Sequence, residues 1–498
     1  MNRKYLLALP FLSGLCIMAV EITASRLLAP YFGSSLFVWT NIIGIVMLAL
    51  SLGYHYGGKL ADNYPKIKNL LILHLTAGVI FLLIPIIIQP VATTVTANLQ
   101  NISSGGIAIF FGSLFLCVIL FAFPLFLLAM TSPFVIRLSE VKPEKIGSIS
   151  GNIFAISTIG SIIGTFLPTL WLIPAFGTRI TVFSCAFILI IMASFGLLNK
   201  KWKILPIVIL FLLPAYHSVQ SKIKPSENLL AEAESSYQYI QVLESKGKRY
   251  LRYNEGYGFQ SVYNPDQILT NSYHDYYSLL PYMNKKSGED IAIIGLAGGT
   301  ISNQLKHFFP EVNVEGIEID SKVIKLAKKY MGLDPNKVSI INQDGRVYLR
   351  QTDSTYDMII VDAYSQAIYI PRALTTKEFW KLVKDRLTDQ GMVAINVNST
   401  SQDSQLMSAI ENTMAKVFPK VYKLKTNADN FNYMLVAGIN IDLDQLRGAN
   451  VNKKLQKRKD IFLSEGDFLE YDSNEMILTD DRAPVQFLTD KMGWKYIF

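Results

Sequence analysis

The residues best suited to chemistry follow short apolar runs in the second half of the chain. The first run, IAIIGLAGGT over Ile291–Thr300, is predicted to be a strand that enters a glycine turn and opens a helix. Twenty-three residues after Gly295, the acid Glu318 lies near the end of the second run, VNVEGIEID. Glycines let the backbone approach a ligand, and a carboxylate accepts hydrogen bonds from ribose hydroxyls. The spacing predicts a nucleoside pocket, with Gly298 and Gly299 in its turn.

Two aspartates follow further strands of the same pattern. Asp344, in the string QDGR, precedes Gly345 at the predicted start of a helix. Asp362 ends the apolar run YDMIIVD, at the carboxyl edge of the predicted sheet, where folds of this kind bind their ligands. A carboxylate there can act as a general base, and its alternative role is to cap the following loop or helix.

The elements that position these residues are predicted from periodicity. Between 237 and 264, apolar and polar residues alternate in three short runs, which indicates a small antiparallel sheet. Strands and helices then alternate, which predicts an α/β Rossmann-like, doubly wound parallel sheet with an antiparallel finish. The strands are expected at 290–295, 312–319, 338–342, 357–362, 391–398, 420–426 and 432–440, and the helices at 300–309, 321–331, 345–351, 375–387 and 402–417. The polar tail 445–498 contains LTDDRAPVQFL, predicted to be a loop and a helix that close the domain.

The first half of the chain has the pattern of a polytopic α-helical membrane protein. Apolar runs near the roughly 20 residues needed to cross a bilayer lie at about 5–23, 37–56, 69–89, 106–131, 150–173, 180–198 and 203–219. The first run is no cleaved signal peptide, because Glu21 interrupts it and further spans follow. The seventh run is the weakest, since it contains Pro206 and Pro214. All three cysteines lie in such runs, so we expect neither a disulfide nor a metal site.

Charge separates the two halves. Residues 1–220 hold 13 Lys and Arg against 4 Asp and Glu, and the remainder holds 34 against 35, so the net charge of +8 belongs to the membrane half. The absence of a basic surplus in the soluble half argues against nucleic acid as a partner. The loop cations predict a cytoplasmic N-terminus in a multi-pass protein of the cell's inner or plasma membrane. Seven crossing spans would place the soluble half outside the cytoplasm, whereas a seventh run lying flat would keep it inside.

Polar and small residues within the apolar half suggest more than anchoring. Glu21 and Arg26 flank the end of the first span, where they form either a functional ionisable site or an interfacial ion pair. The loop Gly57–Lys68 resembles the loop between helices two and three of major facilitator transporters, in which an acid and basic residues form a charge clamp. The fifth run permits close helix packing through three spaced glycines, Gly151, Gly160 and Gly164.

The order of the motifs in the soluble half resembles that of the spermidine synthase family. N-terminal strands, the glycine turn, EID, DG, VDAY and TKEFW follow one another as they do there. The phrases EITASRLLAPYFG, SLGYHYGGKLAD and LTDDRAP are typical of its bacterial and archaeal fused transporter-like members. The resemblance implies an aminopropyltransferase fold related to class I AdoMet methyltransferases. It divides the chain into a transmembrane domain at 1–222, a small β-domain at 232–284 and a Rossmann-like domain at 285–498.

The resemblance also implies roles for individual residues. The cofactor, decarboxylated S-adenosylmethionine or S-adenosylmethionine itself without a metal, would be bound by Gly295, Gly298, Gly299, Glu318, Asp344, Gly345 and Gln260. Asp344 would face the adenine amino group, and Asp362 would deprotonate the attacking amine, because an amine is a nucleophile only when neutral. The substrate side would comprise Tyr273, His274, Asp275 and Tyr364. For His274 a structural hydrogen bond is favoured over base catalysis, and the tyrosines have packing as their alternative role.

Two departures limit how far the activity can be transferred. Family members carry an aspartate in the glycine turn, where this chain has Gly298. They also carry a D-S-S-D loop; the corresponding loop here is DAYS, so its second acid is replaced by Ser365. The missing carboxylates grip ammonium groups of the two substrates, and each such hydrogen bond contributes about 1.5–3 kcal/mol. The loss of two such hydrogen bonds would weaken polyamine chemistry by roughly two to four decades, at about 1.4 kcal/mol per decade. Asp275 and Glu255 are candidates to compensate.

Three functions therefore stay open. The first is aminopropyl transfer to a small-molecule amine with Asp362 as the base, and the second is methyl transfer from AdoMet to an unknown acceptor. The third is a transporter half with a nucleoside-binding domain that has no catalytic activity. A lipid bilayer is an expected partner in all three, and a homodimer is the expected assembly.

Overall fold

The computed structural model describes residues 3–100, 106–139, 145–198, 212, 215–256, 258–283, 290–365, 368–426, 431–439 and 441–497. The chain divides into two compact units. The first comprises Met1–Pro225 with Glu234–Tyr239, and the second comprises Ser226–Ala233 with Ile240–Phe498. Each unit has its own buried apolar core.

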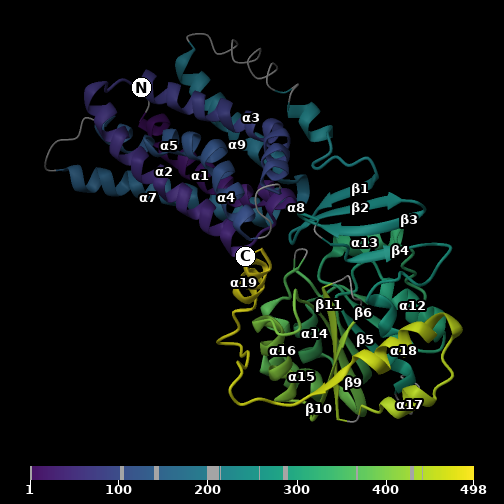
Figure 1. Cartoon of the computed structure of the whole chain (residues 1–498). Helices are drawn as coiled ribbons and strands as arrows, with labels where there is room; N and C mark the ends of the chain where they lie inside the picture. The colour runs from purple at the N-terminus through teal and green to yellow at the C-terminus, as the bar shows by residue number, and fades with distance from the viewer. Residues whose placement is uncertain are drawn as a thin grey trace. The chain divides into compact units, whose positions relative to one another are not determined.

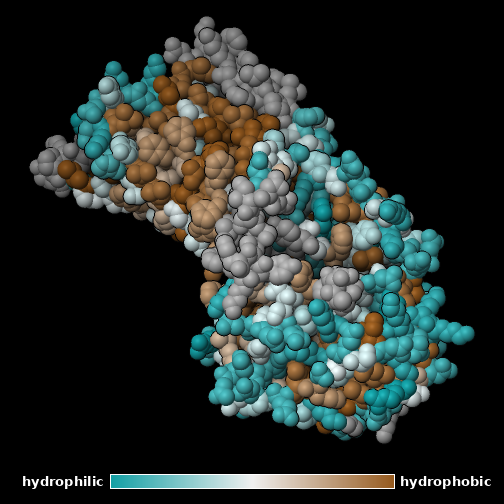
Figure 2. Space-filling view, viewed as in Figure 1, coloured by the Kyte–Doolittle hydropathy of each residue, from teal (hydrophilic) through white to brown (hydrophobic). Residues whose placement is uncertain are grey.

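The first unit is a bundle of long apolar helices (Figure 1). Six segments are long and apolar enough to cross a membrane: Arg3–Phe32, Leu36–Asn63, Ile67–Asn98, Ile109–Leu138, Ile146–Phe176 and Thr178–Leu197. They are built from α1 (Arg3–Phe32), α2 (Leu36–Asn63), α3 (Ile67–Gln100), α4 (Gly106–Cys117), the π-turn η1 (Val118–Ala122), α5 (Phe123–Ala129), α6 (Thr131–Leu138), α7 (Ile146–Leu167), the π-turn η3 (Pro168–Leu172), α8 (Ile173–Phe176) and α9 (Thr178–Leu197). Figure 2 shows hydrophobic side chains on the outer surface of these helices.

Six of the seven predicted apolar runs coincide with these segments. Of the seventh run, 203–219, most residues lie outside the described part of the chain. A seventh span therefore stays a prediction.

Glycines bring α7 against the backbone of α1. A Cβ at Gly160 would lie 2.0 Å from the carbonyl oxygen of Phe11, and one at Gly164 would lie 2.1 Å from that of Leu15. A Cβ at Gly151 would meet nothing within 4 Å. The close packing predicted from the glycines is confirmed at Gly160 and Gly164, whereas Gly151 takes no part in it.

An ion pair joins the ends of α2 and α6. The Nε atom of Arg137 lies 3.4 Å from Oδ1 of Asp62, and both side chains are exposed. Such a contact agrees with the charge clamp implied for the Gly57–Lys68 loop. Because the pair is exposed to solvent, it contributes little to stability.

The second unit begins with a four-stranded sheet made of β1 (Leu229–Glu234), β2 (Tyr239–Ser245), β3 (Lys248–Tyr253) and β4 (Ser261–Tyr263), in that order. β3 pairs antiparallel with both β2 and β4, and Val242 lies opposite Leu251 with both side chains buried. The predicted antiparallel sheet is confirmed. β1 was not predicted, because its sequence LLAEAE lacks the β-branched and aromatic residues that favour strands.

The larger sheet has eight strands in the order β12-β10-β11-β9-β8-β5-β6-β7. β7, β6, β5, β8 and β9 pair in parallel, while β11 runs antiparallel to both β9 and β10. The strands are β5 (Asp290–Ile294), β6 (Asn313–Ile317), β7 (Ser339–Ile341), β8 (Tyr356–Val361), β9 (Leu387–Asn398), β10 (Lys420–Lys425), β11 (Asn432–Gly438) and β12 (Asp467–Leu469). This confirms the doubly wound sheet with an antiparallel finish. The edge strand β12, in the tail, was not predicted.

Helices cover both faces of this sheet (Figure 1). Ile291 and Ile293 of β5 belong to the core beneath α12 (Thr300–Phe308), α13 (Ser321–Tyr330), α17 (Leu443–Gly448) and α18 (Gln456–Glu465). Ala292 and Ile294 belong to the core beneath α14 (Gly345–Gln351), α15 (Lys377–Asp385), α16 (Gln405–Ala415) and α19 (Val485–Ile497). The strand order reverses between β5 and β8, and ligands of open α/β sheets bind at such a point.

Candidate active site

The glycine turn follows β5 at the reversal point. Gly295 has φ +91° and Gly299 has φ +83°, a backbone conformation that side chains disfavour. A Cβ at Gly295 would lie 2.6 Å from the carbonyl oxygen of Asp362 and 2.7 Å from Cα of Ala363. Only glycine therefore allows the ends of β5 and β8 to approach this closely.

Glu318 closes the same turn from the end of β6. It is 7% exposed, and its two oxygens accept hydrogen bonds from the backbone N–H groups of Ala297 (2.9 Å) and Asp320 (3.0 Å). Burial raises the pKa of Glu318 to about 7, against the opposing effect of these hydrogen bonds. Each carboxylate oxygen retains a lone pair, so the residue can accept further hydrogen bonds at the turn.

Asp344 caps the amino end of α14. Its Oδ1 accepts a hydrogen bond from the Val347 backbone N–H at 2.9 Å, and the residue is exposed. A Cβ added at Gly345 would lie 2.3 Å from Cγ2 of Ile294. The absence of a side chain at Gly345 thus lets Asp344 lie close to the end of β5.

A bidentate ion pair links this region to the C-terminal tail. Arg346 donates to both oxygens of Asp480 at 2.7 and 2.6 Å, and Thr376 donates to Asp480 Oδ1 at 2.7 Å. These hydrogen bonds, with that from Arg346 the largest effect, lower the pKa of Asp480 to about 2. Asp480 lies within the LTDDRAP string, so this string positions the segment that follows Asp344.

Asp362 follows β8 and is held by two side-chain donors. Its carboxyl accepts hydrogen bonds from the Tyr273 hydroxyl, at 3.0 Å to Oδ2, and from the Asn396 amide, at 3.3 Å to Oδ1. Burial raises the pKa of Asp362 to about 7, and both donors oppose that rise. The carboxyl therefore exchanges a proton near neutral pH, which a general base requires.

A cavity of about 390 Å³ lies beside Asp362. Its walls include Tyr273 and Asn396, which hold the carboxyl, and also Gln260, His274 and Tyr364. The walls are built from amide and aromatic side chains, and no carboxylate is among the lining residues that the structure describes. The cavity suits a small, partly apolar molecule that carries hydrogen-bond donors.

Two further contacts define the wall. Tyr364 donates to the carbonyl oxygen of Asn396 at 2.8 Å and accepts from the Asn398 backbone N–H at 3.1 Å, which fixes its ring. The Oδ1 atom of Asn396 is buried and has no hydrogen-bond partner among the described residues. An unpaired buried acceptor next to Asp362 indicates that a donor from a ligand belongs there.

His274 has the electrostatics of a structural residue. Its Nδ1 lies 2.6 Å from the Ser272 hydroxyl, and burial lowers the pKa of His274 to about 4. The imidazole is thus neutral at physiological pH. It lines the cavity as a hydrogen-bonding group, in agreement with the interpretation favoured from the sequence.

Asp275 lies inside the protein rather than on the cavity wall. It is 0% exposed and accepts hydrogen bonds from five groups: the backbone N–H groups of Thr270 and Asn271 (both 2.9 Å), the Thr270 hydroxyl (3.0 Å), the Gln304 amide (2.8 Å) and the Arg458 guanidinium (2.9 Å). These contacts hold the turn that carries Tyr273. Asp275 is therefore unsuited to contact the substrate or to compensate for the missing acids.

The structure explains why the turn carries no aspartate. The Gly298 N–H donates to the Ser261 hydroxyl at 2.8 Å, and a Cβ at position 298 would lie 2.6 Å from Cβ of Ser261. Ser261 of β4 thus occupies the space that a side chain at 298 would need. At the second position, the Ser365 backbone N–H donates to the Tyr369 carbonyl oxygen at 2.8 Å, and the residue is exposed.

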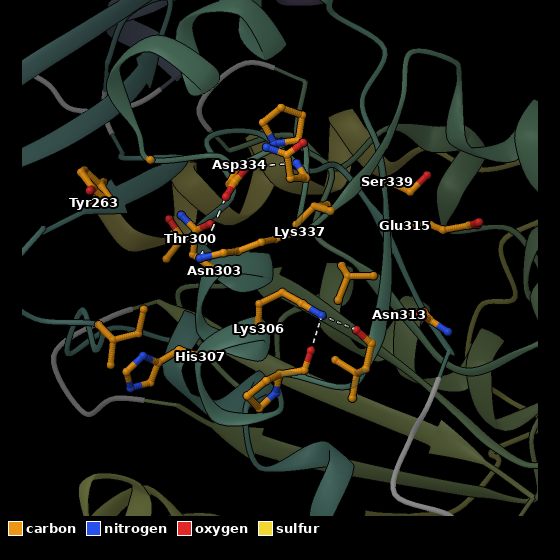
Figure 3. A pocket seen from close by; sticks show the side chains of 18 of the residues that line it. Tyr263, Thr300, Asn303, Lys306, His307, Asn313, Glu315, Asp334, Lys337 and Ser339 are labelled. Carbon is orange, nitrogen blue, oxygen red and sulfur yellow. Dashed lines mark hydrogen bonds and ion pairs between the residues drawn. The ribbon is translucent and has the colours of Figure 1, made fainter.

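A larger cavity, of about 1070 Å³, lies away from these residues. It extends along α12 to the amino ends of β5, β6 and β7, whereas Glu318 and Asp362 follow the carboxyl ends. Figure 3 shows Lys306 directed at the carbonyl oxygens of Pro310 and Val312, and Asp334 close to Lys337. Lys306 and Lys337 are thus paired with the walls of this cavity, and we place the reaction site at the smaller cavity.

The sequence did not identify Asn396, Ser261 or Arg458 as parts of the site. Asn396 lies within an apolar strand, and a polar residue in the run MVAINVN was the one signal available. Among the described residues, no group of three or more His, Cys, Asp or Glu side chains has the arrangement of a metal site.

The fold and the site define a protein of the methyltransferase-like α/β class, with a glycine turn at the reversal point of the sheet and a carboxyl whose pKa is near neutral. Residues 270–433 match the spermine/spermidine synthase domain family. A probable polyamine aminopropyl transferase of Bifidobacterium longum is 32% identical over 282 residues, which cover 52% of this chain and 62% of that protein. Polyamine aminopropyltransferase 1 of Aquifex aeolicus is 30% identical over 39% of this chain and 69% of its own length.

A longer match extends over most of the chain. Polyamine aminopropyltransferase 2 of Aquifex aeolicus is 22% identical over 436 residues, 83% of each protein. The crystal structure of a probable spermidine synthase from Corynebacterium glutamicum covers 50% of this chain and 96% of its own, with a TM-score of 0.42 and 16% identity. The chain belongs to the spermine/spermidine synthase family, whose members found here are named polyamine aminopropyltransferases, a class of transferase.

We predict that Asp480→Asn destabilises the second unit by about 1–2 kcal/mol, because it leaves the Arg346 guanidinium without its charged partner. Asp480 is 41% exposed, which keeps the effect below that of a fully buried pair. Because the native pKa of Asp480 is about 2, below its usual 3.8, the contribution of the pair is complete above about pH 4 and is lost toward pH 2.

Thermal unfolding of the full chain at pH 7 and at lower pH checks this prediction. The difference between wild type and variant should shrink as the pH falls below 4. Asp353→Asn, at an exposed position, is the matched control. Equal midpoints for Asp480→Asn and wild type at pH 7 would contradict the assigned role.

Proposed function

We propose that this protein is a membrane-bound transferase that moves an aminopropyl group from a decarboxylated AdoMet-type sulfonium to the nitrogen of an amine. The observation that carries the proposal is the Asp362 carboxyl, whose pKa is about 7, beside a cavity with amide and aromatic walls. Membership in a family of aminopropyltransferases supports it.

In the proposed reaction, Asp362 and Asn396 orient the attacking amine. The unpaired Oδ1 of Asn396 accepts one N–H, and the ionised Asp362 accepts another and takes up the proton. The bound donor supplies an electrophilic carbon next to a sulfonium. As the new C–N bond forms, the C–S bond breaks and its electron pair remains on sulfur as a neutral thioether. Asp362 then releases the proton to solvent.

The donor is expected to lie at the glycine turn. Glu318 has lone pairs available for ribose hydroxyls. Burial disfavours its charged form, so hydrogen bonds from a ligand would stabilise that form. Asp344 is exposed and next to the end of β5, a position compatible with an adenine amino group. Gln260 and His274 line the adjoining cavity with Tyr273 and Tyr364.

The amine acceptor is expected to differ from a simple diamine. The described lining residues of the cavity offer amides and aromatic rings rather than carboxylates. Aromatic rings attract a cation more weakly than a carboxylate does. An acceptor with a single amino group and an apolar body fits these walls better than one with a second ammonium group.

A location in the membrane is part of the proposal. The six long apolar helices support a multi-pass protein, and the cationic loops support a cytoplasmic N-terminus. With six crossings the second unit would share the cytoplasm with the nucleoside donor. Whether the seventh run crosses the membrane decides on which side the second unit lies, and that run lies largely outside the described residues.

Methyl transfer from AdoMet is the second candidate, and the packing at Gly298 favours it. Ser261 fills the space in which a turn carboxylate would repel the carboxylate of AdoMet. Nothing described at this turn selects against the methionine carboxylate, so AdoMet itself is a plausible donor on steric and electrostatic grounds.

For the base, we predict that Asp362→Asn lowers turnover by at least about 100-fold while leaving donor binding within about twofold. The turnover of the wild type should rise with pH through about 7, since Asp362 must be ionised to accept the proton. Product formation with purified full chain and calorimetry with the donor measure the two effects. The exposed Asp266→Asn is the control, and unchanged turnover in Asp362→Asn would remove the residue as the base.

For the donor, aminopropyl transfer predicts that the full chain binds decarboxylated AdoMet at least as tightly as AdoMet, because no carboxylate at position 298 of the described turn acts on the methionine carboxylate. Calorimetry with both compounds tests this directly. Glu318→Gln should weaken both compounds alike, because it acts on the shared ribose. A preference for AdoMet would overturn aminopropyl transfer in favour of methyl transfer, and binding of neither would contradict both.

A further inference from the structure

Glu21 lies inside the membrane-spanning part of α1. Eleven residues separate it from the end of α1 at Phe32, about 16 Å of helix at about 1.5 Å per residue. Ile45, which lines the same cleft from α2, lies nine residues, or about 14 Å, from the start of that helix at Leu36. With a hydrocarbon core about 30 Å thick, this depth places the Glu21 carboxyl within the apolar part of a bilayer.

Glu21 is partly exposed and lies beside a small apolar cleft. Glu21 lines it together with Val20, Ala24, Ile42, Ile45, Val46, Cys117, Phe121 and Leu125. The cleft has no room for a water molecule in this conformation. The walls from α2 and α5 are aliphatic, η1 contributes a phenyl ring, and the Cys117 thiol of α4 is the one other titratable group among the described lining residues.

Within the described part of the chain, Glu21 has neither a hydrogen bond nor an ion pair. Arg26, the expected partner, instead donates to the backbone carbonyl oxygens of Ser235 and Ser236. The interfacial ion pair considered from the sequence is therefore not formed.

Two other ionisable side chains of the helix bundle, Asp62 and His74, have partners. Asp62 is exposed and paired with Arg137. His74 is buried, and its two ring nitrogens lie 2.9 Å from the Leu70 carbonyl oxygen and from the Ser13 hydroxyl. The sequence of residues 1–220 contains just two further acids, Glu140 and Glu144. Of the two acids of this half that the structure describes, Glu21 and Asp62, Glu21 is the one that lies deep in the bundle and has no partner.

We propose that Glu21 is a proton-binding site within the membrane half, of the kind that couples a carrier to the proton gradient. An isolated carboxylate at this depth of a bilayer is strongly disfavoured, so the site holds the neutral acid as long as neither water nor a cation reaches it. The carboxyl releases its proton only when the cleft opens to water or admits a cation. No bond other than O–H is made or broken. The inference rests on the membrane location proposed above and is independent of the transferase chemistry.

Carbodiimide labelling of the full chain in liposomes tests the proposal. Dicyclohexylcarbodiimide partitions into the bilayer and reacts with protonated carboxyl groups, and mass spectrometry of the digested protein identifies the modified residue. We expect modification at Glu21 in the wild type at neutral pH and its loss in Glu21→Gln. Asp62→Asn, which removes an exposed acid of the same bundle, should leave the labelling of Glu21 unchanged.

A water-soluble carbodiimide supplies the opposite control, since it should modify the exposed Asp62 and spare Glu21. Failure of the apolar reagent to modify Glu21 in the wild type would overturn the proposal, and so would equal modification by the soluble reagent. The wild-type result does not depend on the folding of any variant. Transferase turnover measured on the same liposomes separates a failure of this inference from a failure of the proposed function.

Discussion

The half-buried Asp362 carboxyl lies at the reversal point of the sheet, and the rest of the site depends on the two hydrogen bonds that it accepts there. Burial alone would keep the acid protonated, and the hydrogen bonds from Tyr273 and Asn396 draw its pKa back to about 7. Three segments meet there: the end of β8, strand β9, and the turn before α11 (His274–Tyr277). A movement of any of these three segments would change the proton affinity of the Asp362 carboxyl.

Residues that do not contact the Asp362 carboxyl position the groups that do. Asp275 accepts five hydrogen bonds, one of them from its ion-pair partner Arg458 of α18, and so anchors the turn that carries Tyr273 to the C-terminal tail. Gly295 permits the close approach of β5 and β8 that brings the nucleoside turn next to Asp362. The tail is thus part of the site, and Asp480 has a similar role beside Asp344.

Much of this arrangement could be predicted because it is local. The β5 turn, Glu318 and Asp362 each follow a strand whose apolar pattern is plain in the sequence, and the order of the strands predicts that their ends meet. Arg458 reaches Asp275 across 183 residues of sequence, and Ser261 fills the place of a side chain at Gly298 from another sheet. The sequence around each of these residues does not indicate such long-range contacts. β1 and β12 were missed because both are edge strands with weak propensity.

The pH dependence of turnover in Tyr273→Phe tests the central claim most directly. Loss of the Tyr273 hydroxyl removes a hydrogen bond that stabilises the ionised Asp362, so the acidic limb of the rate profile should move upward by about one pH unit from its wild-type position near 7. Tyr276→Phe, whose hydroxyl has no described contact with Asp362, should leave the limb in place. An unshifted limb in Tyr273→Phe would contradict the assignment of Asp362 as a base tuned by this contact.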